Sequence, residues 1–242
     1  MRYTHGLHII RKKRHALKIS LIISALIIVL VVVLGFKLLD AQQFFIGFLQ
    51  SLSRVTISYF VAFLLALGLA FLATANPTTE DVLIPLLDVM QSFPSFALFP
   101  LLVLSLGKSS VVTIIILVLE MIWPILFSIV SARKQLRPEL LEAATIFGAK
   151  GSKLLTQVLF PLLWPAIITG SIVAWGEAWE AIIAAEIIVA VPGVGSYLAN
   201  LGSTGNAGLL LVGITLLLAL LFIINKYVWL PLLGSGTAYV TD

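Results

Sequence analysis

The chain has 242 residues, of which 60% are hydrophobic and 11% are charged, and its mean hydropathy is +1.14. Soluble domains carry about 25% charged residues, so this composition excludes a soluble globular protein and predicts a polytopic, all-α membrane protein. The formal net charge of +4 does not indicate nucleic-acid binding, because most Lys and Arg residues flank apolar runs, and the lack of cysteine excludes disulfides and thiolate metal sites.

The N-terminal part is a basic tail, residues 1–16, followed by the uncharged run Ile19–Phe36. This run is long for a signal peptide, and no convincing small-x-small cleavage site follows it. We therefore expect a retained first span, with residues 17–242 forming one transmembrane domain.

Three further spans are predicted before the middle of the chain. The second begins near Gly47 and contains the uncharged stretch Val55–Thr74, which is long enough to cross a hydrocarbon core. A polar loop, Asn76–Asp81, is expected to end it. The third span is expected at about Asp88–Leu106 and the fourth at Val111–Ser131.

The central loop, residues 132–157, is the one long polar interruption between apolar runs and holds five of the fifteen Lys and Arg residues. Pro138 is placed like a first-turn proline, Glu139 falls early where a helix favours negative charge, and Gly148 sits where a helix would stop. These signals predict a short helix from about Pro138 to Phe147. Ser152 is a plausible N-cap for a second helix.

The fifth span is expected to begin at about Val158 and to end near Trp175. The next segment, residues 176–206, is irregular, and its apolar piece Ala178–Val191 is too short to cross alone. We expect a re-entrant or extracytoplasmic segment there. A sixth span, from Ala207 to about Val228, completes the set of about six.

The distribution of cations predicts the orientation. With six crossings, twelve of the fifteen Lys and Arg residues fall on the side of the N-terminus, and three fall on the other side: Lys37, Arg54 and Lys108. Cytoplasmic loops carry the excess of positive charge. We therefore expect the central loop and both termini in the cytoplasm.

The spacing in the central loop resembles a known motif. Glu142-Ala143-Ala144 is followed after three residues by Gly148, after nine more by Val158, and then by Leu159-Phe160-Pro161. This is similar to the EAA loop of binding-protein-dependent ABC importer permeases, with Val158 in place of Ile and Phe160 in place of Leu. Segments 51–55, 91–94 and 185–195 look like the branch that handles nitrate, sulfonate, taurine or bicarbonate.

The resemblance implies a type I importer fold in the cytoplasmic (inner) membrane of a prokaryote. Two permease subunits, identical or paralogous, would form the pathway, two cytoplasmic ATPase subunits would bind ATP and Mg, and an external solute-binding protein would deliver a small anion or organic anion. The chain itself would hold no cofactor or metal and would not be an enzyme. It would couple to the ATPase through Glu139, Glu142, Ala143, Ala144, Gly148, Val158 and Pro161.

Five polar residues in apolar runs are candidates for the solute pathway: Arg54, Ser58, Glu120, Glu177 and Glu186. An arginine at this depth attracts an anion, pairs with a carboxylate from another span, or snorkels to the interface. Glu120 is either a site residue or an interior hydrogen-bonding group. Glu186, nine residues after Glu177, is expected on the opposite helix face, so the glutamates do not form one cluster.

Two other functions remain open at this point. A secondary carrier would use Glu120 and Arg54 as coupling or substrate groups, although no internal repeat supports it. A membrane scaffold would use the central loop to recruit a soluble partner without transport. No Ser/His/Asp or Cys/His set is evident, so catalysis by this chain is not expected.

Overall fold

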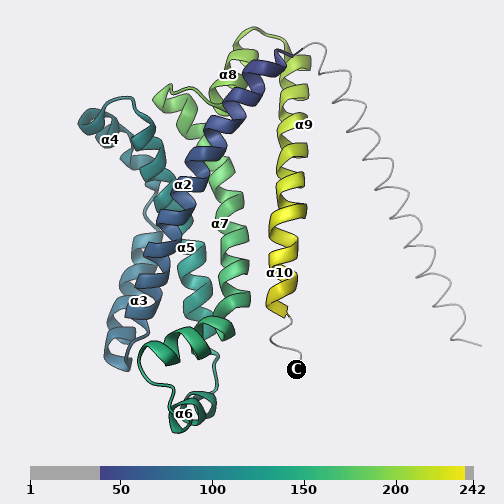
Figure 1. The fold of residues 1–242 in the computed structure, drawn as a ribbon. Coiled ribbons are helices and arrows are strands. Elements are labelled where there is room, and N and C mark those ends of the chain that lie inside the picture. Colours follow the sequence, from purple (N-terminus) through teal and green to yellow (C-terminus); the bar gives the residue numbers. More distant parts are fainter. Residues whose placement is uncertain (1–38, 238–242) are drawn as a thin grey trace, which may run out of the picture.

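The computed structural model describes residues 39–237, which are helical without any β-strand in that range. This confirms the predicted all-α, polytopic fold (Figure 1). The basic tail and the predicted first span, Ile19–Phe36, lie outside the described residues.

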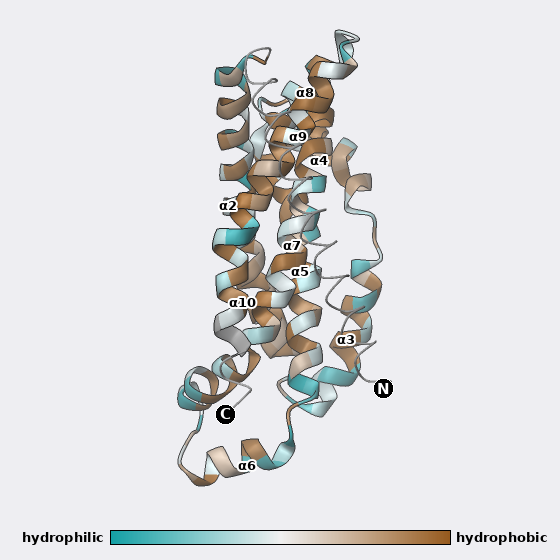
Figure 2. Ribbon diagram, turned by 90° about the vertical axis from the view of Figure 1, so that its right-hand side faces the viewer, coloured by the Kyte–Doolittle hydropathy of each residue, from teal (hydrophilic) through white to brown (hydrophobic). Residues whose placement is uncertain are grey.

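Four helical segments in this part of the chain are long and apolar enough to cross a membrane singly: Ala41–Ala73, Ser110–Lys134, Leu154–Val189 and Ala207–Gly234. A fifth crossing is counted if a bent pair of helices forms one span. The described residues thus contain a counterpart for each of the second to sixth predicted spans. Figure 2 shows apolar residues along the length of the bundle and hydrophilic residues near the segments that lead into α6.

The bent pair corrects the predicted third span. Helix α3 (Pro77–Gln91) begins where a loop was expected, because the Asn76 side chain accepts a hydrogen bond from the Thr79 N–H at 2.9 Å and Pro77 occupies the first turn. After Gln91 the chain turns by 71° into the 3₁₀ segment η1 (Ser95–Leu98) and α4 (Phe99–Leu106). The expected single span from Asp88 is therefore wrong.

Helix α5 (Ser110–Lys134) is the centre of the bundle, since α2 (Ala41–Ala73) and α7 (Phe160–Val189) both pack against it. The α5–α7 contact is close at Gly170, where a Cβ atom would lie 2.8 Å from the backbone oxygen of Pro124. On α2, the buried face carries Ala62, Ala66 and Ala70. Small residues at this spacing allow helices in a membrane to approach closely.

Helix α7 corrects the predicted fifth span. A π-helical turn, η2 (Leu154–Leu159), runs directly into α7, and α7 continues to Val189 rather than ending near Trp175. The apolar piece after Trp175 is thus the continuation of α7, within a helical segment that is long enough to cross a membrane, and not a separate irregular segment. The π turn has a local cause, because Pro161 has no N–H to donate and its ring crowds the preceding turn, which widens so that the Phe160 N–H reaches the Leu155 oxygen.

The remaining helices are α6 (Pro138–Ile146), α8 (Val194–Ser203), α9 (Ala207–Ile224) and α10 (Leu230–Thr237), with the π turn η3 (Asn225–Trp229) between the last two. The sixth span therefore starts at Ala207 as predicted and extends beyond Val228. Helices α6 and α8 lie at opposite ends of the bundle (Figure 1), which we call the α6 end and the α8 end.

Candidate functional site

Helix α6 stands clear of the bundle at the α6 end, and none of its residues is buried. It begins at Pro138 with Glu139 in its first turn, as the sequence predicts. A proline fits there because its missing N–H would be unpaired in any case, and the carboxylate faces the positive end of the helix dipole. Its start is thus set by local chemistry rather than by packing.

The exit from α6 is a Schellman motif, a hydrogen-bonded turn that ends a helix. Gly148 has φ +86°, its N–H donates to the Thr145 oxygen at 3.1 Å, and the Ala149 N–H donates to the Ala144 oxygen at 2.9 Å. A left-handed backbone at this place favours glycine. The predicted helix stop at Gly148 is confirmed.

The surface of α6 is apolar where it projects furthest. Ile146 is 82% exposed, Phe147 is 89% exposed, and Leu140 is half-exposed, while Glu142 and Ala143 are exposed beside them. An exposed apolar patch with a polar rim is typical of a protein-binding surface. The structure thus places Glu139, Glu142, Ala143, Ala144 and Gly148 on one projecting element, and Val158 and Pro161 at the base of α7.

At the other end of the bundle, Arg54 and Glu186 form a buried ion pair. One guanidinium nitrogen of Arg54 lies 2.7 Å from Oε1 of Glu186, and the two residues are 8% and 0% exposed. The same nitrogen donates to the Pro192 oxygen at 2.6 Å, and Nε donates to Ser110 at 3.2 Å. Of the three alternatives for Arg54, the structure shows pairing with a carboxylate from another span.

One backbone N–H group and a serine hydroxyl also donate hydrogen bonds to Glu186. The Ser51 hydroxyl lies 2.7 Å from Oε1, the Gly195 N–H donates to Oε2 at 2.8 Å, and the Val194 N–H donates to Ser51 at 2.9 Å. The N-terminus of α8 thus faces the carboxylate, an arrangement that helix ends favour. This network joins α2, α7 and α8.

The network depends on glycine because the backbone passes so close to Glu186. A Cβ atom on Gly193 would lie 2.1 Å from the Glu186 carboxyl group, and one on Gly195 would lie 2.6 Å from the Ile183 oxygen. Sequence analysis missed this role for Ser51 and Gly195. The signal was present, because a carboxylate in an apolar run requires several donors, and Gly193-Val194-Gly195 supplies N–H groups nearby.

The other pathway candidates are arranged differently. Ser58 is buried and donates to the Ile114 oxygen on α5 at 3.3 Å. Glu120 on α5 is half-buried and accepts a hydrogen bond from Ser95 in η1. Glu177 is exposed on α7 and lies near enough to Glu120 for their charges to interact. The structure thus brings Glu120 and Glu177 together and separates both from the Arg54–Glu186 pair.

The chain is similar in sequence to known transport proteins. A sequence model of the family described as "Binding-protein-dependent transport system inner membrane component" matches residues 62–228. The taurine transport system permease protein TauC of Escherichia coli (strain K12) is 26% identical over 175 residues, which cover 72% of this chain and 64% of that protein.

Two other relatives come from Synechocystis sp. The nitrate import permease protein NrtB is 27% identical over 148 residues, which cover 61% of this chain and 54% of that protein. The bicarbonate transport system permease protein CmpB is 27% identical over 151 residues, which cover 62% and 54%. The matched part of the chain spans between half and two thirds of the length of these three relatives. These matches confirm the predicted family resemblance.

Proposed function

Because the chain belongs to the family of inner membrane components of binding-protein-dependent transport systems, we propose that it is the membrane-spanning permease subunit of an ATP-driven importer. The observation that carries this proposal is α6, a helix without a buried residue that presents Ile146 and Phe147 at one end of the bundle. Members of this family are transport components rather than catalysts.

In the proposed complex, two cytoplasmic ATPase subunits bind Mg-ATP, and each receives one α6 helix. A second permease subunit, identical or paralogous, completes the pathway, and an external solute-binding protein delivers the solute. The α6 end is then cytoplasmic and the α8 end faces outward. The names of the relatives supply a substrate class, a small anion or organic anion such as taurine, nitrate or bicarbonate.

The chain's own contribution to transport is to change shape when α6 moves. Helix α6 is joined on one side to α5 and on the other to the π turn that runs into α7. Since α5 and α7 pack tightly along their length, displacement of α6 acts on both helices together. Alternation between inward and outward access would follow from that movement.

A pull-down in mild detergent from the native host, with mass spectrometry of the co-purified proteins, tests the proposal. We expect an ATPase to accompany the tagged chain, and we expect the double variant Ile146→Asp, Phe147→Asp to lose it. Thr78→Asp is the matched control, because it adds a carboxylate to an exposed residue in the first turn of α3. Recovery of intact chain without an ATPase, or equal recovery with the double variant, would refute the docking role of α6.

A further inference from the structure

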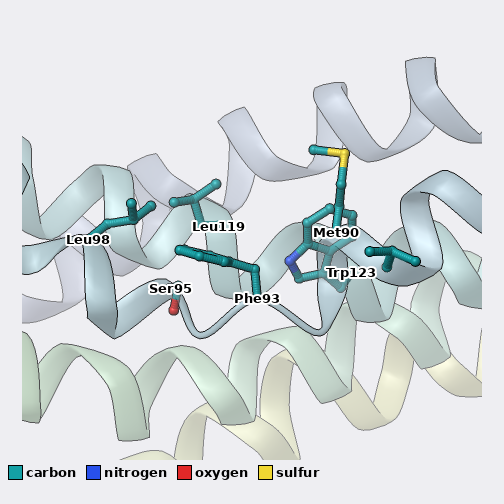
Figure 3. A pocket seen from close by; sticks show the side chains of 7 residues that line it. Met90, Phe93, Ser95, Leu98, Leu119 and Trp123 are labelled. Atoms are coloured by element: carbon teal, nitrogen blue, oxygen red, sulfur yellow. The ribbon is translucent and has the colours of Figure 1, made fainter.

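A cavity of about 400 Å³ lies at the break between α3 and α4, against α5. Its volume falls within the range of about 300–1,000 Å³ that is usual for small-molecule sites. Two aromatic rings contribute to the wall (Figure 3). The lining residues are Val89, Met90, Phe93, Ser95, Leu98, Leu119 and Trp123.

The wall of this cavity is linked to a carboxylate through Ser95. The Ser95 side chain is buried, and its hydroxyl donates to Oε1 of Glu120. Glu120 directly follows the lining residue Leu119 on α5 and precedes Trp123 by three residues, so all three lie on neighbouring turns of the helix. Glu120 itself does not line the cavity, so Ser95 is the link between the cavity wall and the carboxylate.

The charge of Glu120 is not balanced by a cation in the part of the chain that the structure describes. Within residues 39–237 the ion pairs are Arg54–Glu186 and Lys134–Glu80. The arginine that might attract an anion is thus already neutralised by its own partner. Glu177 lies close enough for its charge to interact with that of Glu120, which makes the potential here more negative.

We propose that this cavity binds the positively charged ammonium group of a small organic solute, with Phe93 and Trp123 against the apolar surface of the solute and Glu120, which lies one hydrogen bond behind Ser95, as the counter-charge. Aromatic faces and a carboxylate both attract an ammonium group. Nitrate or bicarbonate would instead meet an uncompensated carboxylate. This inference rests on the proposed importer function and narrows its substrate, because taurine is the solute named among the three relatives that carries an ammonium group.

Two pairs of probes test the inference by calorimetric titration of the purified full chain in nanodiscs of neutral lipid. Taurine is compared with isethionate, in which a hydroxyl replaces the ammonium group, and choline with its uncharged analogue 3,3-dimethylbutan-1-ol. We expect at least one of the two ammonium probes to bind at least about tenfold more tightly than the probe in its pair that lacks the ammonium group. Equal binding, or no binding, of both members in both pairs would overturn the inference.

Variants locate the binding. Glu120→Gln keeps an oxygen acceptor for Ser95 but removes the charge. We expect this variant to bind the ammonium probe and its uncharged partner with equal affinity. The exposed-site control Asp81→Asn should keep the difference in affinity between the two probes. Trp123→Leu is expected to weaken the ammonium probe by about two- to thirtyfold. Phe222→Leu, a change on the exposed face of α9, is its control. Retention of the full difference by Glu120→Gln would contradict the assignment.

The titration uses no ATPase, so its result is separate from the pull-down. If an ATPase co-purifies but neither ammonium probe is preferred, the importer function stands and the substrate inference fails. If a probe binds through Glu120 but no ATPase is recovered, the site stands and the importer function fails.

Discussion

Replacement of Glu186 by alanine tests the energetic role of the buried network at the α8 end. The change removes the carboxylate that lies 2.7 Å from Arg54 and accepts from the Gly195 N–H. Arg54 is only 8% exposed, so its guanidinium would stay away from water without a counter-charge. Its remaining acceptors, the Pro192 oxygen and the Ser110 hydroxyl, are neutral.

The size of the effect follows from this geometry. At 2.7 Å and an effective dielectric constant of about 20, the attraction between the two charges is about 6 kcal/mol. The cost of removing both charges from water offsets much of it, so the pair itself adds little to the stability of the folded chain. Loss of one partner leaves that cost uncompensated, and we expect Glu186→Ala to lower the free energy of unfolding by about 3–5 kcal/mol.

A double variant separates this mechanism from simple loss of contacts. In Arg54→Leu, Glu186→Leu no charge remains buried, and we expect a smaller loss of stability than in either single variant. The assay is equilibrium unfolding by SDS from mixed micelles, followed by circular dichroism. Glu180→Gln, at an exposed position of α7, is the control and should change stability by less than about 0.5 kcal/mol.

Two outcomes would refute this reasoning. One is a loss of less than about 1 kcal/mol in Glu186→Ala, which is the cost of one ordinary hydrogen bond. The other is a double variant whose loss equals the sum of the two single losses, because independent sites behave in this additive way.

Two further predictions concern glycines. Gly193→Ala should destabilise the fold by about 1–3 kcal/mol, since its methyl group would overlap the Glu186 carboxyl group. The control Gly176→Ala, whose methyl group would meet nothing within 4 Å, should not destabilise the fold. SDS unfolding measures both variants, and equal losses of stability would contradict the clash at Gly193. Gly148→Asp should uncouple ATP hydrolysis from solute uptake in membrane vesicles. Gly148→Asn should retain more coupling, because asparagine tolerates positive φ as aspartate does but adds no charge to the docking surface. Unchanged coupling in Gly148→Asp would count against the docking role.

The elements predicted best are those fixed by neighbouring residues. The bounds of α6 follow from Pro138 at its start and Gly148 at its end, and both signals act within one turn of the helix. The start of the sixth span at Ala207 is similar, since the Asn206 side chain accepts from the Leu209 N–H at 3.1 Å. Such local hydrogen bonds can be inferred from sequence alone.

The errors arise where distant residues decide the structure. The apolar piece after Trp175 was expected to form a re-entrant or extracytoplasmic segment, because it is too short to cross alone. The helix continues because Glu186 is paired with Arg54, which is 132 positions away, so that the carboxylate is compensated inside the bundle. Sequence analysis offered pairing with a carboxylate as one of three alternatives for Arg54, but nothing local identified the partner.

The prediction of the third span was wrong for a different reason. The polar run from Asn76 to Asp81 has the composition of a loop, yet Asn76 and Thr79 cap a helix that starts at Pro77. The cap was present in the sequence and was not recognised. The hydrogen bond from Ser95 to Glu120, by contrast, depends on the 71° turn between α3 and α4, which apolar periodicity does not predict.

The continuity of α7 has a mechanical consequence. Its 30 residues form a rod of about 45 Å, with the π turn before Phe160 and the interior Pro165 both near the α6 end. These are the weak points of the helix, because backbone hydrogen bonding is altered or missing there. The rod is therefore hinged near one end and anchored at the other through Glu186, so a swing of α6 displaces the α6 end of the rod more than the segment that carries Glu177.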